Sequence, residues 1–156
     1  MAGLTVGDKA PDFDLPADGN SHVRLEDFRG SPLVLYFYPK DDTSGCTAEA
    51  IAFTALADDF RAAGATVLGI SPDSCADHDA FKAKHGLTVR LAADEDKTVL
   101  QRYGVWAEKS MYGRTFMGVE RTTFLIAPDG AIARIWHKVK VPGHAEAVLD
   151  AVKALP

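Results

Sequence analysis

Short runs of apolar residues, each about as long as one strand, recur along this chain and are separated by segments with helical periodicity. The run Leu33–Tyr38 is apolar or aromatic throughout, which predicts a strand buried on both faces. A second buried strand is expected at 65–70. Residues 120–127 and 131–137 lie on either side of a Pro-Asp-Gly turn, which predicts a pair of antiparallel strands.

Helical patterns follow most of these strands. Residues 45–63 carry apolar side chains at helical spacing, and Gly64 is a typical helix stop. Further helices are expected at about 76–85 and 97–103. A closing helix is expected at 143–155, where the apolar positions recur every three or four residues.

The remaining segments are shorter and more polar. Residues 13–15 and 22–25 alternate apolar and polar side chains around a turn at 17–20, which predicts a small N-terminal β-hairpin. Leu91 and its neighbours are expected to form a short strand. Residues 105–118 mix aromatic side chains with glycine and polar residues, so we expect a loop with a short extended piece.

This order of elements mixes crossover units with hairpins and contains no internal repeat or linker. It predicts one domain over residues 1–156, of the α/β class, with a central mixed β-sheet and helices on both faces. The length of 156 residues and the hydrophobic fraction of 47% suit one soluble domain.

Charge and cysteine content narrow the function classes. The net charge is −5 and the basic residues form no block, so neither nucleic acid nor an anionic membrane is an expected partner. No apolar run reaches membrane-spanning length, and the N-terminus lacks a signal-peptide pattern. The two cysteines are too few for a disulfide scaffold. We therefore expect a cytoplasmic protein whose cysteines serve chemistry.

Cys46 is the main candidate for that chemistry. It falls in the first turn of the helix that follows the Leu33–Tyr38 strand, where unpaired N–H groups and the helix dipole favour an anion. Such a setting lowers a thiol pKa from about 8.5 toward roughly 3.5–7.5. The Thr43 hydroxyl can reach the same backbone donors. The alternative is a small buried core cysteine beside an ordinary capping threonine.

The strand, turn and helix around Cys46 resemble the thioredoxin fold, but no Cys-x-x-Cys is present. Pro39-x-x-x-Thr43-x-x-Cys46 instead is similar to the active-site signature of the peroxiredoxins. The longer stretch 36–50, YFYPKDDTSGCTAEA, resembles the bacterioferritin comigratory protein (Q-type) subfamily. The likeness covers nearly the whole chain and includes residues 103–106, 109–114 and 121–126.

This resemblance implies a role for each residue of the signature. Cys46 would be the peroxidatic thiolate that attacks a peroxide oxygen, Thr43 would hydrogen-bond the peroxide, and Pro39 would shield the pocket from water. Arg121 would be the cationic partner of the thiolate, and Glu49, on the Cys46 face of the helix, could orient Arg121. Without the resemblance, Arg121 could be a surface strand charge and Glu49 a solvated helix residue.

The chain departs from the subfamily at two points. Ser44 stands where the family usually has proline, which should loosen the turn but removes no catalytic group. The positions at which members carry a resolving cysteine hold Ile51 and a residue close to Lys82. Cys75 is the remaining candidate. It either resolves oxidised Cys46 after local unfolding of both helix starts, or is a small turn residue while an external thiol resolves Cys46.

The resemblance implies a thiol peroxidase that reduces hydrogen peroxide and organic hydroperoxides without metal, flavin or haem. Thioredoxin or a similar dithiol would supply the electrons, and the subfamily likeness implies a monomer. The alternative is a redox sensor or interaction protein that uses Cys46 as a switch. Thr43 and Arg121 favour the enzyme, because a slow sensor does not need them.

Other polar residues give weaker signals. Asp41 and Asp42 read as solvated turn residues. The histidines at 78, 85, 137 and 144 show no spacing with carboxylates or cysteines that would predict a metal site. We therefore expect no metal and no cofactor.

Overall fold

Strand β3 (Leu33–Phe37) is at the centre of the fold, and all of its residues are buried. It pairs in parallel with β4 (Thr66–Ser71) and antiparallel with β8 (Thr122–Ile126). The computed structural model describes residues 3–156, in which the mixed sheet has the strand order β2-β1-β5-β4-β3-β8-β9. The outer strands of this sheet are β1 (Asp14–Ala17), β2 (Ser21–Arg24), β5 (Arg90–Ala93) and β9 (Ile132–Trp136).

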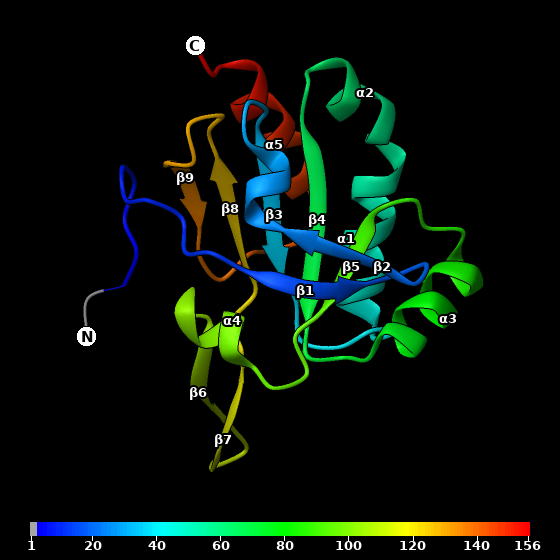
Figure 1. Cartoon of the computed structure of the whole chain (residues 1–156). Helices are drawn as coiled ribbons and strands as arrows, with labels where there is room; N and C mark the ends of the chain where they lie inside the picture. The colour runs from blue at the N-terminus through cyan, green and yellow to red at the C-terminus, as the bar shows by residue number, and fades with distance from the viewer. Residues whose placement is uncertain (1–2) are drawn as a thin grey trace.

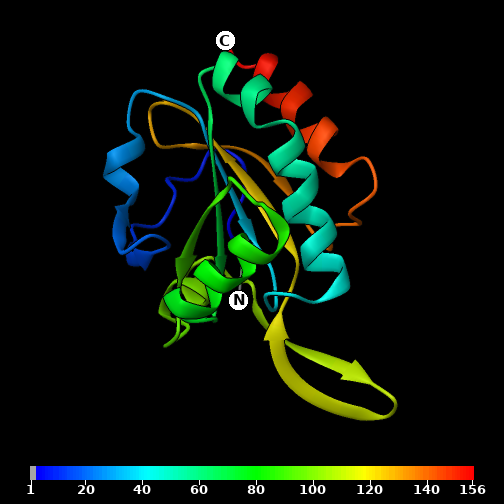
Figure 2. The same cartoon turned by 90° about the vertical axis from the view of Figure 1, so that its right-hand side faces the viewer.

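Helices cover both faces of this sheet, as expected for a thioredoxin-like α/β fold (Figures 1 and 2). One face packs against helices that contribute side chains such as Phe53, Phe60 and Val148 to a shared apolar cluster. These helices are α1 (Ser44–Ala55), α2 (Ala57–Ala62), α3 (Cys75–His85) and α5 (His144–Lys153). The opposite face is covered by the 3-10 helix η1 (Leu25–Phe28) and by α4 (Thr98–Arg102).

The N-terminal hairpin is confirmed. Strands β1 and β2 pair antiparallel from Asp14↔Arg24 to Ala17↔Ser21. The turn between them places Gly19 and Asn20 at positive φ, a conformation that glycine and asparagine tolerate well. Ala17 then pairs with Ala92, which joins the hairpin to the main sheet.

The expected helix at 45–63 is two helices in the structure. Helix α1 ends at Ala55 and α2 begins at Ala57, with Leu56 as the residue between them. The break leaves the apolar pattern in place, because Phe53 and Phe60 still enter the same cluster. Periodicity alone could not locate it.

The expectation of a loop at 105–118 was wrong. Strands β6 (Trp106–Met111) and β7 (Arg114–Val119) form a two-stranded sheet of their own, which projects from the body in both views (Figures 1 and 2). Tyr112 and Gly113 join them, both at positive φ. Most of β7 is exposed on both faces, so the sequence lacks the alternation that marks a half-buried strand.

None of the helices within residues 3–156 combines the length and the apolar character that crossing a lipid bilayer requires.

Candidate functional site

Cys46 lies in the first turn of α1, at the carboxyl end of β3, and its side chain is almost completely buried. Thr43 precedes the helix with extended backbone, and its carbonyl accepts the first helical bond from the Thr47 N–H at 2.8 Å. The Thr43 side chain does not cap the helix. Within residues 3–156 no side chain caps α1, which leaves its first N–H groups available to an oxyanion beside the sulfur.

Arg121 brings a fixed cation to this sulfur. Its Nη2 donates to Cys46 Sγ at 3.3 Å. The residue lies immediately before β8, whose first residue Thr122 pairs with Phe37 at the end of β3. The guanidinium crosses α1 at Gly45, where a Cβ atom would lie only 3.1 Å from Nη2. A glycine at this point leaves room for the close approach.

Glu49 lies one turn beyond Cys46 on the same helix and holds the other side of the guanidinium. Arg121 Nη1 donates to Glu49 Oε1 at 2.6 Å, and the glutamate side chain is only 2% exposed. Burial raises the pKa of Glu49 to about 7, although Arg121 acts in the opposite direction. Glu49 Oε2 has no hydrogen-bond partner within residues 3–156. Arg121 is thus fixed between a buried carboxyl group and the thiol.

Thr43 and Pro39 lie in the loop that connects β3 to α1. The Thr43 hydroxyl donates to the carbonyl of Lys40 at 2.8 Å, so it points along the loop instead of capping the helix. Its oxygen lone pairs stay available to accept a hydrogen bond. Pro39 is half-buried next to the fully buried Tyr38.

Lys109 is a second cation near the thiol that sequence reasoning missed. It is half-buried on β6, and its side-chain carbons pack against Gly118. Burial lowers its pKa, as does the charge of Arg121, whereas Cys46 raises it. Both cations line a hollow of about 330 Å³ at the base of the β6–β7 hairpin. Recognising the hairpin would have been the signal, since its register pairs Lys109 with Phe116, three pairs beyond the Trp106↔Val119 pair at its base.

Cys75 is the first residue of α3 and is half-buried. Burial raises its pKa, as do the negative charges of Asp79, Glu95 and Asp18. These acids belong to the β1–β5 side of the sheet, whereas Arg121 and Cys46 lie on the β3–β8 side. Both cysteines are free thiols.

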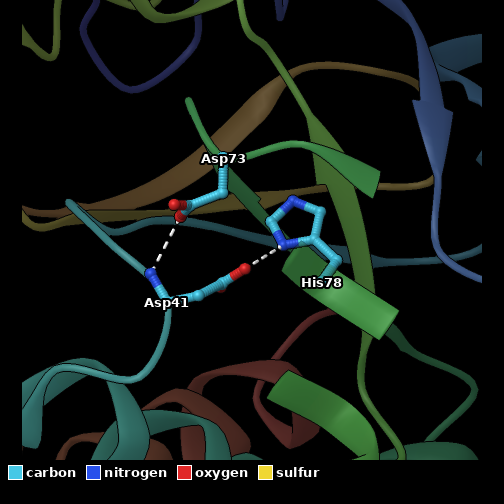
Figure 3. A group of neighbouring side chains, drawn as sticks. All are labelled: Asp41, Asp73 and His78. Carbon is cyan, nitrogen blue, oxygen red and sulfur yellow. Dashed lines mark hydrogen bonds and ion pairs between the residues drawn. The ribbon is translucent and has the colours of Figure 1, made fainter. Parts of the chain in front are cut away.

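The expectation that Asp41 is a solvated turn residue was wrong. Asp41 is buried, and His78 Nδ1 lies 2.6 Å from its Oδ2. Figure 3 shows this pair together with Asp73, whose Oδ2 accepts from the Asp41 backbone N–H at 2.8 Å. The histidine expectation also needs correction, because His78, His85 and His137 each contact a carboxylate. Burial of an α3 side chain against the Cys46 loop is a tertiary contact that neither segment reveals alone.

Asp41, Asp73 and His78 also place ligand-type atoms within 4.8 Å of one another. A metal ion would need these atoms free, but each is already engaged. His78 Nδ1 bonds Asp41, while Asp73 Oδ2 accepts from the Ser71 hydroxyl at 2.6 Å as well as from the Asp41 N–H. The group is therefore a hydrogen-bond network.

Comparison with known proteins agrees with this geometry. Residues 6–135 match the AhpC/TSA family. The chain is 48% identical to the peroxiredoxin Bcp of Xanthomonas campestris over 147 residues, covering 93% of this chain and 92% of the relative. It is 47% identical to a putative peroxiredoxin bcp of Coxiella burnetii, covering 94% of this chain and 97% of the relative.

Solved structures give the same result. A cysteine-to-serine variant of PrxQ from Xylella fastidiosa superposes with a TM-score of 0.93 at 42% identity, covering 99% of this chain and 98% of that one. Peroxiredoxin Q of Xanthomonas campestris superposes with a TM-score of 0.87 at 46% identity, covering 91% and 90% of the two chains. The chain belongs to the AhpC/TSA family, and within it to the thiol peroxidases of the peroxiredoxin Q (Bcp) type.

Proposed function

We propose that Cys46 is the peroxidatic residue and that the chain reduces hydrogen peroxide and organic hydroperoxides. The observation that carries this proposal is the 3.3 Å contact between Arg121 Nη2 and Cys46 Sγ at the start of α1. A fixed cation and free helix N–H groups stabilise a thiolate and also the charge that develops on a leaving oxygen. The relatives support the substrate class, because the bacterioferritin comigratory protein of Xanthomonas campestris has alkyl peroxide reduction activity.

In the proposed reaction, the Cys46 thiolate attacks the terminal oxygen of the hydroperoxide. A sulfur–oxygen bond forms, the oxygen–oxygen bond breaks, and the leaving alkoxide takes a proton to become an alcohol, or water for hydrogen peroxide. The cysteine becomes a sulfenic acid. Arg121 and the first N–H groups of α1 stabilise the departing oxygen.

Thr43 and Pro39 complete the proposed pocket. The Thr43 hydroxyl gives its own hydrogen to Lys40, so its oxygen accepts the O–H of the peroxide and aligns the two peroxide oxygens with the sulfur. Pro39 covers the sulfur side of the pocket without adding an N–H that would hold water. Glu49 acts through Arg121, whose guanidinium it holds.

A thiol must then return the sulfenic acid to the reduced state. We propose thioredoxin or a similar dithiol as the reductant, with Cys75 as the resolving cysteine. The two helices cover the same face of the sheet, but Cys46 lies beside β3 and β8 whereas Cys75 lies toward β1 and β5, so the first turns of α1 and α3 must unwind before a disulfide can form. We further propose that the chain works as a single-domain monomer in the cytoplasm.

Stopped-flow kinetics with one equivalent of hydrogen peroxide tests the proposal. We expect rapid peroxide consumption by the wild type and by Cys75→Ser, and none by Cys46→Ser. Equal consumption by Cys46→Ser and wild type would refute the assignment of Cys46.

Mass determination of the oxidised wild type tests the role of Cys75. Loss of two hydrogens, with the Cys46 and Cys75 peptides linked, supports the resolving role. Gain of one oxygen on Cys46, with unchanged thioredoxin turnover in Cys75→Ser, would assign resolution to an external thiol.

A further inference from the structure

A buried network connects the loop that carries the reactive cysteine to α3 and β5. His78, on α3, is completely buried. Its Nδ1 lies 2.6 Å from Asp41 Oδ2, and its Nε2 lies 2.9 Å from the carbonyl oxygen of Ala92 on β5. The Tyr38 hydroxyl donates to the other Asp41 oxygen at 2.6 Å. Figure 3 shows His78 pointing from its helix toward Asp41.

Both ring nitrogens of His78 therefore face oxygen acceptors. A carbonyl oxygen can only accept, so Nε2 of His78 must carry a hydrogen. An ionised Asp41 can also only accept, which requires a hydrogen on Nδ1. Imidazole is ordinarily a stronger base than a carboxylate, so the shared proton belongs on His78. The ring is then an imidazolium paired with the Asp41 carboxylate.

The surroundings of the ring favour its charged form. Burial alone would lower the pKa of His78, but the hydrogen bond and charge of Asp41, the carbonyl of Ala92 and the charge of Asp73 raise it overall. Tyr38 is the other titratable group at the ring, with its hydroxyl 3.4 Å from Nδ1. Burial raises the pKa of this hydroxyl well above the usual range, so it stays neutral.

We propose that His78 is a positioning residue, an imidazolium that fastens the 38–43 loop to α3 and β5 and thereby holds Cys46 in its reactive setting. The proposal rests on the function proposed above. The loop contains Pro39 and Thr43 and leads directly into the first turn of α1. Loss of the His78 proton removes one of its two hydrogen bonds and leaves the Asp41 charge buried without its partner, which favours opening of the loop.

This fastening also controls what happens to oxidised Cys46. While the loop is closed, the sulfenic acid can react with a second hydroperoxide to give a sulfinic acid and an alcohol. Once the loop opens, the sulfenic acid can condense with a thiol to give a disulfide and water. A tighter fastening therefore favours rapid attack on peroxide and overoxidation, whereas a looser one favours resolution.

Nitrogen-detected NMR of the reduced wild type tests the protonation state directly. We expect the His78 ring to show both nitrogens protonated at pH 7. In Asp41→Asn, which nearly preserves shape, the titration should move to lower pH because the anion is gone. A neutral His78 ring at pH 7 in the wild type would overturn the proposal, as would an unchanged titration in Asp41→Asn.

Hydrogen exchange tests the fastening, with His78→Gln as the variant and His85→Gln as its matched control. His85 also reaches the same loop from α3, but through an exposed contact with Asp42 at 2.8 Å. We expect residues 38–47 to exchange about 10- to 100-fold faster in His78→Gln, as for the loss of a hydrogen bond to a charged group. His85→Gln should match the wild type. Equal exchange in all three proteins, or an equal effect in both variants, would refute the proposal.

The wild type provides a test that needs no mutation. Exchange of residues 38–47, corrected for intrinsic rates, should accelerate as the pH rises through the His78 titration seen by NMR. A protection that stays constant through that titration would contradict the proposal, even if His78→Gln fails to fold.

Two activity measurements separate this proposal from the proposed function. His78→Gln should react more slowly with hydrogen peroxide and form less sulfinic acid per turnover than the wild type. A wild type that consumes no peroxide would refute the proposed function, while the NMR and exchange results would still decide whether His78 fastens the loop. Normal wild-type activity with unchanged overoxidation in His78→Gln would refute only the effect on Cys46.

Discussion

Arg121 contacts two partners with one planar group, and this geometry determines which substitutions it tolerates. Nη2 donates to the Cys46 sulfur at 3.3 Å while Nη1 donates to Glu49 at 2.6 Å. The fork shape of a guanidinium allows both bonds at once, whereas the ammonium of lysine is a compact point charge on a flexible stem. A substitution of Arg121 that keeps only its positive charge should therefore not preserve the rate of peroxide reduction.

We predict that Arg121→Lys lowers the second-order rate constant for hydrogen peroxide by about 100- to 1000-fold, the range typical for loss of a preorganised transition-state donor. Stopped-flow kinetics at pH 7 measures this. Arg114→Lys, a cation on the exposed part of β7, is the control and should retain the wild-type rate. If the two variants behave alike, the fork geometry does not matter.

Gly45 gives a prediction in which stability and activity change in opposite directions. A methyl group there would lie 3.1 Å from Arg121 Nη2, so the guanidinium must shift by a few tenths of an ångström. Alanine is also the better helix former, by up to about 1 kcal/mol. We expect Gly45→Ala to raise the free energy of unfolding slightly and to slow the reaction with peroxide several-fold.

Urea unfolding and stopped-flow kinetics on the same samples test this pair of effects. Ser44→Ala, one residue earlier and exposed, is the control and should leave the rate unchanged. An unchanged rate in Gly45→Ala would contradict the prediction, because it would mean that the Arg121 guanidinium accommodates the methyl group without losing its function.

At the level of single residues, the sequence predicted which side chains meet at the candidate site better than it predicted the contacts that support them. Cys46 and Glu49 lie together because a helix start after a central strand and a one-turn spacing along a helix are local properties, whereas the place of Arg121, 75 residues from Cys46, was implied by the family resemblance. Asp41 and His78 were missed because their contact joins segments 37 residues apart. Neither segment carries a periodic signal that would indicate that contact.

Elements that pack against the core were predictable, and the β6–β7 hairpin was not. The strands of the main sheet and the closing helix α5 carry apolar patterns because each packs against the core. Most of β7 is exposed to solvent, so the hairpin has no apolar pattern of that kind. Its turn also has an uncommon sequence. Tyr112 has φ +53° and is 95% exposed, although such turns normally prefer asparagine followed by glycine.

The hairpin turn therefore offers a stability test that should not involve the chemistry. Tyr112→Asn should raise the free energy of unfolding by about 0.5–1 kcal/mol, because asparagine tolerates positive φ better than tyrosine. Gly113→Ala, at φ +76°, should lower it. Thermal unfolding of both variants measures the effect, with peroxide reduction expected to stay at the wild-type rate. Stabilisation by Gly113→Ala would contradict the turn geometry.

For the molecule as a whole, two buried histidines make stability depend on pH in opposite directions. The pKa of His78 is raised in the fold, so its contribution is present below about pH 6.5 and is lost as the pH rises through its folded value. His144 acts in the reverse sense. Burial, together with the charge of Arg121, lowers the pKa of His144 to about 4. Through these two residues, stability should therefore be greatest at about pH 6.5, below the folded titration of His78.

His144 makes the acid side of that optimum testable. His144 is the first residue of α5, and its Nε2 is 2.8 Å from the Thr123 hydroxyl oxygen. Its ring packs edge-on against the rings of Phe53 and Trp136. In the unfolded chain the His144 imidazole becomes protonated near pH 6.5, whereas in the folded protein it becomes protonated only near pH 4. The wild type should therefore lose about 3 kcal/mol of stability through this residue as the pH falls across that interval.

Urea unfolding at half-unit steps from pH 7.5 to 4 measures this loss. His144→Gln has no group that titrates in this range, so its stability should fall less steeply than that of the wild type below pH 6.5. His22→Gln, which removes a half-exposed histidine of β2, is measured alongside as the control for loss of a histidine away from α5. If the stability of His144→Gln and of the wild type fell in parallel with pH, His144 would become protonated at the same pH in the folded and unfolded states. It would then carry a positive charge beside Arg121, the residue that the proposed chemistry requires.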